Sequence, residues 1–384
     1  MKDVLVVGAS LAGASTAIHL ARSGLTVQLI DRAEFPRRKA CGEGLFPRGV
    51  EALEDLGVHD QVLSQAKVLD SLRVELGGAF VEARLASPTH PAIGVRREVL
   101  DAALLQRARQ SDVEVSLGVT AIDLCISPTG YRAVRTNRGE FAARAIVVAD
   151  GLRSRLRRAA GLDTRVRRQR YGVSARYFLR EEAEPRVQIR MVPGYEMYVT
   201  PVGGHVVNVA VLVDKHQSRM LAGHLGRSYD AIVRESGILP NGASLLDSPL
   251  AAGPFPAGAR RDWRGNLVLV GDAAGFFDGI SGEGMSLALV ASEFAARAVQ
   301  QFLQDGDPAH FATYERARHR LGRNSNLLAR ISLLLAAHPS LGRRVIGNLS
   351  KRPQTFEKLL AINSGVSGLA ALRPRDVGCL LLGV

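Results

Sequence analysis

The chain has 384 residues, enough for two domains or for one large domain with an insertion, and its 46% hydrophobic and 23% charged residues are typical of a globular protein. No apolar run reaches the roughly 20 residues of a transmembrane helix, so no membrane span is expected. The net charge of +13 either reflects an ordinary solvated surface rich in arginine, which is the simpler interpretation, or favours anionic partners, namely phosphates or an acidic membrane face. Nucleic acid is not expected, because no basic stretch is interleaved with stacking aromatic side chains.

The cysteine content bears on the cellular compartment of the protein and on whether it has a metal site. Cys41, Cys125 and Cys379 lack the spacing of metal ligands, so neither a metal site nor a disulfide framework is expected. Such sparse cysteine use indicates a reducing, cytoplasmic setting.

A strand, a glycine-bearing turn, a helix and a second strand open the chain, and we expect them at residues 4–7, 8–13, 14–23 and 27–30. This order predicts a dinucleotide site in which the helix N-terminus faces a pyrophosphate. The alternatives are a plain strand-turn-helix without a ligand and a secretory signal peptide. The signal peptide is set aside because glycines and a histidine interrupt the apolar run.

Single residues in this opening unit have separate roles. Gly8 lets the chain turn sharply out of the strand, and Gly13 lets the helix pack closely on the sheet. Asp31 ends the second strand, where its carboxylate can accept hydrogen bonds from a ribose. Ser10 takes the place of the usual second glycine, which weakens the fingerprint but keeps the position small.

The elements that follow alternate less regularly. We expect a loop at 32–44, a helix at 47–56, a hairpin at 72–86, a helix ending near 109, a strand at 113–117 and a strand meander at 119–148. The hairpin breaks the alternating pattern and predicts part of a second, antiparallel sheet.

The second half is predicted to be mostly strands and then helices. We expect a short helix near 153–158, strands at 172–178, 187–191, 195–200, 206–213 and 266–270, helices at 218–236 and 285–304, and a helical tail at 308–384 divided by Pro339, Pro353 and Pro374.

Three glycine-bearing turns, each at the end of an apolar strand, carry a family resemblance. They lie at 8–13, 150–151 and 271–272, and a Gly-Glu-Gly turn at 282–284 follows the last of them. Together they resemble the FAD-dependent flavoproteins that include p-hydroxybenzoate hydroxylase, geranylgeranyl reductases and flavin-dependent halogenases. The resemblance covers most of residues 1–305.

The resemblance implies an α/β fold in which a Rossmann-like FAD-binding domain (1–70, 95–165 and 260–305) surrounds an antiparallel substrate domain (71–94 and 166–259) and precedes C-terminal helices (306–384). It places FAD against Gly8, Ser10, Ala12, Gly13, Asp31, Arg32, Arg38, Cys41, Arg97, Asp150, Gly151, Asp272, Gly282, Gly284 and Met285. The last three would open a helix whose N–H groups face the flavin N1–C2=O edge. FAD would be non-covalent, and NAD(P)H would bind transiently as the reductant.

Local detail is most similar to the geranylgeranyl-reductase branch, at residues 38–45 and 275–284. The resemblance implies a substrate pocket at Tyr198, Thr200, Asp278 and Gly279. Gly279 stands where the family usually has proline, and Tyr198 and Thr200 replace larger aromatic residues. Halogenation is not expected, since the single tryptophan, Trp263, lies outside the strand that carries paired tryptophans in halogenases.

Three functions share this FAD site. The first is a monooxygenase in which reduced flavin reacts with O2, through a C4a-hydroperoxide, to hydroxylate or epoxidise a hydrophobic or aromatic small molecule; the sequence favours it slightly. The second is a reductase of carbon–carbon double bonds in a prenyl or other lipid substrate. The third is an FAD-binding protein without turnover.

Several features remain open to more than one interpretation. Cys41 is either a flavin-facing thiol or a small loop residue, and His205 and His216 are either proton donors or structural side chains. The leucine- and arginine-rich tail either covers the core, forms a dimer contact or touches a membrane surface peripherally. No catalytic residue and no oligomeric state is assigned.

Overall fold

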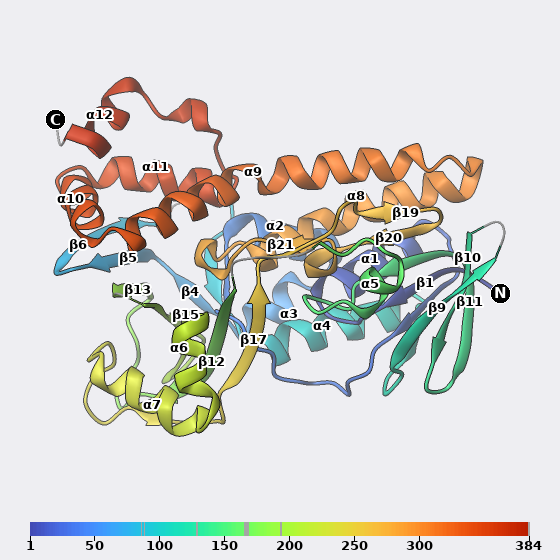
Figure 1. Cartoon of the computed structure of the whole chain (residues 1–384), viewed down its shortest axis with the longest axis horizontal. Coiled ribbons are helices and arrows are strands. Elements are labelled where there is room, and N and C mark those ends of the chain that lie inside the picture. The colour runs from blue at the N-terminus through green and yellow to red at the C-terminus, as the bar shows by residue number, and fades with distance from the viewer. Residues whose placement is uncertain (86, 88, 128–129, 165–168, 193, 383–384) are drawn as a thin grey trace.

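The computed structural model describes residues 1–384 except 86, 88, 128–129, 165–168, 193 and 383–384 (Figure 1). The end of the predicted hairpin, two residues of the predicted meander and the end of the predicted tail therefore lie outside the described residues.

The first sheet is mostly parallel and is built around β1. Its main strands, in spatial order, are β19 (Trp263–Arg264), β20 (Leu267–Leu269), β11 (Gly139–Val148), β1 (Lys2–Val7), β2 (Val27–Ile30) and β8 (Glu114–Ser116). All neighbours in this order are parallel except β19 and β20. The meander of β9 (Ala121–Ser127) and β10 (Gly130–Thr136) continues antiparallel from β11.

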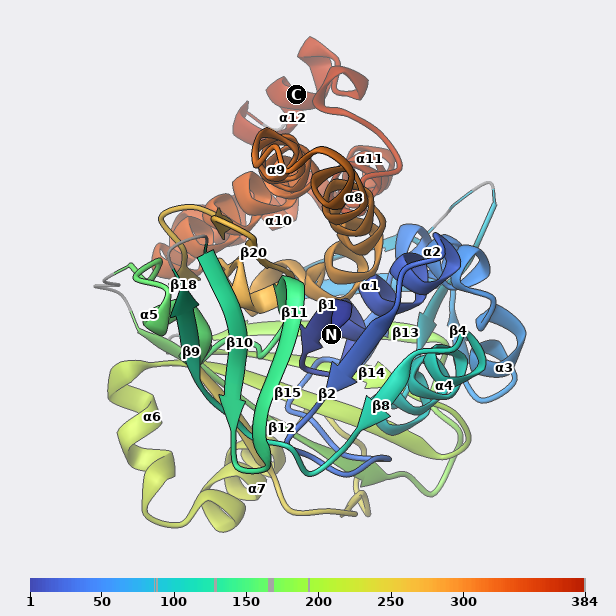
Figure 2. The same cartoon turned by 90° about the vertical axis from the view of Figure 1, so that its right-hand side faces the viewer.

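Both faces of this sheet are buried, which explains its uninterrupted apolar strands. Val4 and Val6 face a core that includes residues of α1 (Leu11–Arg22), α4 (Arg97–Gln110) and α8 (Gly284–Asp305). Leu5 and Val7 belong to a separate core that includes residues of the meander. Strands β9, β10 and β11 lie next to β1 at this side of the molecule (Figure 2). Helix α1 begins three residues earlier than predicted, because Ser10 already serves as its N-cap.

A second sheet carries the rest of the strands. Its order is β16 (Ser244–Leu245), β12 (Arg170–Phe178), β15 (Val206–Asp214), β14 (Tyr195–Pro201), β13 (Arg186–Val192), β5 (Ser71–Leu76) and β6 (Ala79–Arg84), and β17 (Leu250–Phe255) pairs with β12. The predicted hairpin thus forms β5 and β6 of this sheet. The β13–β5 pair is parallel and the other pairs are antiparallel.

Helices cover both faces of the second sheet. Helices α6 (Lys215–Ala222) and α7 (Leu225–Glu235) lie on one face, and α10 (Pro339–Ser350) and α11 (Pro353–Asn363) lie over β5 and β6 on the other (Figure 1). The single helix predicted at 218–236 is wrong, since the chain leaves the helical conformation at His224. Strand β17 was not predicted, because Gly253 and Pro254 are uncommon inside strands.

Smaller elements connect the two sheets. They are β3 (Gly44–Leu45), α2 (Pro47–Leu56), α3 (His59–Leu63), β4 (Lys67–Leu69), β7 (Ala92–Gly94), α5 (Arg155–Ala159), β18 (Ala257–Gly258) and β21 (Gly275–Phe276). In the described part of the chain, no helix is both long and apolar enough to span a bilayer.

The predicted division of the tail by prolines is confirmed. Pro339, Pro353 and Pro374 each stand at the first residue of a helix, namely α10, α11 and α12 (Pro374–Leu382). Proline is favoured there because its fixed φ suits a helix and its missing N–H has no intrahelical acceptor in the first turn. The long α9 (Ala309–Ala337) precedes them and packs along α8.

We expect Gly13→Ala to destabilise the fold, because a Cβ at Gly13 would lie 1.8 Å from the Gly8 carbonyl oxygen. Forcing these backbones apart should lower the free energy of unfolding by about 3 kcal/mol. Urea unfolding measures the loss. The control is Gly347→Ala in α10, whose Cβ would meet nothing within 4 Å and which should be neutral or slightly stabilising. Equal stability of both variants would contradict the expectation.

Candidate functional site

The carboxyl ends of four parallel strands bring the predicted turns together. The Gly8 N–H donates to the Ile30 carbonyl at 2.7 Å, and the Ala149 N–H donates to the Val7 carbonyl at 2.8 Å. The Val270 N–H donates to the Val148 carbonyl of the neighbouring strand at 2.9 Å. The turns after β1, β2, β11 and β20 therefore meet at one edge of the sheet, which is where open α/β sheets bind ligands.

Two helix N-termini open at this edge without side-chain caps. Ser10 is the N-cap of α1 and Glu283 is the N-cap of α8, and neither side chain accepts a hydrogen bond from its helix. The first-turn N–H groups of both helices are thus available to an anion, and the helix dipoles favour negative charge there.

A single cavity of about 1070 Å³ contains both helix N-termini. Ligand pockets usually measure roughly 300–1,000 Å³, so this cavity has room for a large ligand. Its lining includes most of the predicted residues: Gly8, Ser10, Ala12, Asp31, Arg32, Arg38, Cys41, Arg97, Asp150, Gly151, Tyr198, Thr200, Asp272, Gly279, Gly282, Gly284 and Met285. Gly13 and Asp278 are not part of the lining; Gly13 lies beneath the first turn.

Asp31 is held in place by the turn that precedes α1. Its Oδ2 accepts a hydrogen bond from the Ala9 N–H at 2.7 Å, and its Oδ1 accepts one from the Ala33 N–H at 2.8 Å. The carboxylate is buried but still lines the cavity. Each oxygen keeps lone-pair capacity for a second donor.

Ser10 is tied to Arg97, the first residue of α4. Arg97 Nη2 donates to Ser10 Oγ at 2.7 Å and to both carboxylate oxygens of Asp101, at 2.9 and 3.0 Å. Burial by itself would lower the pKa of Arg97, but the neighbouring Asp101 carboxylate raises it overall. Serine at the second glycine position therefore links the first turn to a second helix.

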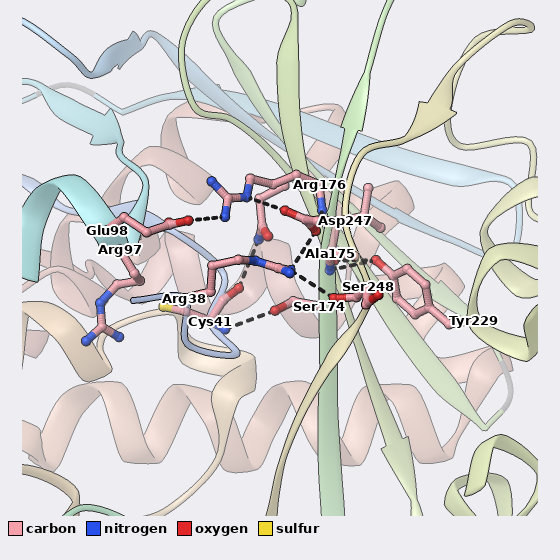
Figure 3. A network of polar contacts seen from close by, with 12 residues as sticks. Arg38, Cys41, Arg97, Glu98, Ser174, Ala175, Arg176, Tyr229, Asp247 and Ser248 are labelled. Atoms are coloured by element: carbon pink, nitrogen blue, oxygen red, sulfur yellow. Dashed lines mark hydrogen bonds and ion pairs between the residues drawn. The ribbon is translucent and has the colours of Figure 1, made fainter. Parts of the chain in front are cut away.

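The loop that carries Arg38 and Cys41 is fastened to the second sheet (Figure 3). Arg38 Nη2 donates to Asp247 Oδ1 at 2.6 Å. The Cys41 N–H donates to Ser174 Oγ at 3.1 Å, and Asn208 Nδ2 donates to the Cys41 carbonyl at 2.9 Å. The second sheet thus holds the loop that forms one wall of the cavity.

Arg176 completes this network from β12. Its Nε lies 3.1 Å from Asp247 Oδ2, and its Nη2 lies 2.6 Å from Glu98 Oε1 on α4 (Figure 3). Asp247 therefore bridges Arg38 and Arg176. The sequence analysis missed Glu98, Arg176 and Asp247, because only the register of β12 brings these charges together.

Asp278 supports the cavity wall from behind. It pairs with Arg170, whose Nε lies 3.2 Å from Asp278 Oδ2, and Arg170 also pairs with Glu196. Tyr198 is buried in front of these charges, and its hydroxyl has no hydrogen-bond partner among the described residues. Burial, together with Glu196 and Asp278, raises the pKa of Tyr198.

Two buried glutamates were also missed. Glu43 lines the cavity; its Oε1 accepts from the Arg97 N–H at 2.8 Å, and its Oε2 has no partner among the described residues. Burial raises the pKa of Glu43 to about 7 and that of Glu283 to about 8. The sequence signal that could have identified these two glutamates is the tripeptide Gly-Glu-Gly, which occurs at 42–44 and again at 282–284. The two turns meet where Cys41 Sγ lies 3.6 Å from Met285 Sδ.

Comparison with known proteins agrees with this geometry. A family model described as an FAD binding domain matches residues 1–220. The menaquinone reductase of Mycolicibacterium smegmatis is 32% identical over 313 residues, covering 77% of this chain and 75% of that protein. The digeranylgeranylglycerophospholipid reductase 1 of Methanothermobacter thermautotrophicus is 28% identical over 340 residues, covering 83% of both chains.

The solved structure of a flavoprotein/dehydrogenase from Cytophaga hutchinsonii has the same fold. It aligns with a TM-score of 0.82 at 20% identity and covers 95% of this chain and 92% of that chain. The predicted α/β fold class is confirmed.

We expect the stability of the protein to fall as pH rises through the range in which Glu43 ionises. Its pKa is raised from 4.5 to about 7, so between these values the folded chain binds more protons than the unfolded chain. The difference amounts to about 3 kcal/mol lost by pH 8. Glu43→Gln stays neutral and should lose this part of the pH dependence.

Urea unfolding at about pH 5 and about pH 8 measures this effect. Glu283→Gln should change the profile in the same direction, since the pKa of Glu283 is also raised. Glu51→Gln, at an exposed position of α2, is the matched control and should leave the profile unchanged. If the stability of Glu43→Gln depended on pH as that of the wild type does, the prediction would be contradicted, because Glu43 would then be ionised in the folded chain.

Proposed function

The chain belongs to the FAD-binding-domain family of flavin-dependent oxidoreductases, and we propose that it is a reductase of isoprenoid lipids. The reaction would add one hydride and one proton across a carbon–carbon double bond, which leaves a saturated bond. NAD(P)H is the proposed source of the two electrons. The observation that carries the proposal is an apolar arm that continues the FAD cavity toward the C-terminal helices.

The residues at the sheet edge fit FAD. The uncapped N-terminus of α1 suits the pyrophosphate, and Asp31 suits the adenosine ribose. The absence of a side chain at Gly8 leaves backbone exposed to the cavity at this point. The uncapped N-terminus of α8, at Gly284 and Met285, suits the edge of a flavin that becomes negative on reduction.

The apolar arm lies between the second sheet and the C-terminal helices. Strands β5, β13 and β15 contribute Leu72, Val74, Ile189 and Leu212 to its wall, and α9, α10 and α11 contribute Leu335, Leu349, Phe356 and Leu360. Such a wall suits a flexible hydrocarbon chain, because burial of apolar surface is its main source of affinity. A compact aromatic substrate would need only the part of the cavity beside the flavin and not the apolar arm.

The names of the relatives support this substrate class. Menaquinone and digeranylgeranylglycerophospholipid, which the two relatives are named for reducing, are both lipids with isoprenoid chains. Monooxygenation, which the sequence alone favours slightly, uses the same FAD residues and is the alternative outcome of the test below.

The chain supplies groups that can hold a proton at the cavity wall. Reduced FAD, when bound, supplies the hydride. Glu43 is half protonated near pH 7 and lines the cavity beside Cys41. Tyr198 lines the apolar arm, and its buried hydroxyl has no hydrogen-bond partner among the described residues. We propose these two as the proton-holding residues, and the ion pairs of Arg170 hold the wall behind Tyr198 in place.

The test incubates the FAD-loaded protein under nitrogen with NADPH or NADH, or with dithionite, and an isoprenoid quinone in detergent micelles. After any quinol has been reoxidised to the quinone in air, mass spectrometry should show two additional hydrogen atoms in the isoprenoid chain. Ala210→Phe, which narrows the arm, should keep FAD and reduce turnover about 100-fold, since small displacements of a substrate are costly. Incorporation of labelled oxygen in air, without saturation under nitrogen, would favour the monooxygenase instead.

A further inference from the structure

An exposed apolar stripe lies along α9. Leu327, Ile331 and Leu334 have relative exposures of 41%, 44% and 52%. Spacings of four and three residues place them on one face of the helix. Among the described residues, half of the exposed large hydrophobic side chains lie between positions 327 and 377. A soluble surface rarely gathers apolar side chains in this way unless it contacts something.

The same region is strongly basic. Residues 323–384 contain nine lysines and arginines but only two acidic residues, an excess of seven charges within a net charge of +13. One of the two acids, Asp376, is buried and paired with Lys358. Arg323 and Arg330 are exposed on α9 beside the apolar stripe. The surface therefore combines apolar side chains with unneutralised positive charge.

The apolar arm of the cavity reaches this stripe. Ile331 is both exposed and part of the cavity lining, and Leu328 and Leu335 line the cavity on either side of it. Leu327 and Leu334, by contrast, are exposed and do not line the cavity. The stripe thus borders the place where the arm opens on α9, the long helix that runs along the upper side of the molecule (Figure 1).

We propose that the α9 face, formed by Leu327, Ile331 and Leu334 with Arg323 and Arg330, docks on an anionic lipid bilayer. The leucines and isoleucine would enter the headgroup–acyl boundary while the arginines pair with lipid phosphates. A lipid chain could then pass from the bilayer into the arm at Ile331 without crossing water. Only this last step rests on the proposed function; docking itself does not.

Charge favours a bilayer over a second copy of the chain. A two-fold dimer through this face would place two positively charged surfaces against each other, which opposes association. An anionic bilayer instead neutralises the arginines, because its negative surface potential attracts them.

The experiment measures co-flotation of the FAD-loaded full chain with vesicles of phosphatidylcholine alone or mixed with phosphatidylglycerol. The wild type should float with the anionic vesicles, and salt should weaken the binding. Leu327→Glu/Leu334→Glu should bind at least about tenfold more weakly, because it removes apolar contact and adds negative charge. Ile126→Glu, at a 70% exposed residue of β9, is the matched control and should bind like the wild type.

Equal recovery of the wild type with and without anionic lipid, or undiminished binding of the double variant, would overturn the proposal. So would size-exclusion data in which the wild type is a dimer that the double variant converts to a monomer, without vesicle binding.

The double variant also separates this proposal from the proposed function. In detergent micelles it should keep its FAD and its rate of isoprenoid reduction, since Leu327 and Leu334 do not line the cavity. Docking without any isoprenoid reduction would overturn the proposed function alone. Isoprenoid reduction in micelles without binding to anionic vesicles would overturn only the proposal that the α9 face docks on a bilayer.

Discussion

Direct backbone contact between the turn after β1 and the turn after β11 is the constraint on which the site depends. A Cβ at Gly8 would lie 2.3 Å from the Ala149 carbonyl oxygen, and one at Gly271 would lie 2.7 Å from Ala12 Cβ. Three turns from distant parts of the sequence can share one edge only because these positions carry no side chain. That contact aims the N-terminus of α1 at the cavity and keeps Asp31 and Asp150 at its rim.

The sequence allowed this edge to be predicted because its signals are local. An apolar strand followed at once by glycine marks each turn, and parallel strands necessarily end at the same edge. The prolines that begin α10, α11 and α12 are local signals of the same kind. The network around Asp247 has no such signal. Arg38 and Arg176 are separated by more than a hundred residues, and only the packing of the loop on β12 makes them share one carboxylate.

The apolar arm could not be predicted for a different reason. Alternating apolar residues on β5 and an amphipathic tail indicate that the strand and the helices pack together, but not whether their side chains fill the space between them. Leu76, for example, is a core residue that also lines the cavity, as does Leu349 on α10. A buried leucine side chain can either pack against a neighbouring side chain or line a cavity. Which of these occurs depends on the distances between helices and strands, and the periodicity of apolar residues in the sequence does not reveal those distances.

Burial raises the pKa of Glu43 although several arginines lie nearby. Arg97 is neutralised by Asp101, and Arg176 is shared between Glu98 and Asp247. Both cations still favour a Glu43 carboxylate, but burial outweighs them and the nearby Glu98 acts in the same direction as burial, so the pKa of Glu43 is raised. A neutral carboxyl in the cavity wall can donate a hydrogen bond or a proton without repelling negative charge that develops in front of it. The packing that fastens the loop thus has a second effect, because it buries Glu43 and so raises the pKa of the acid that the loop carries.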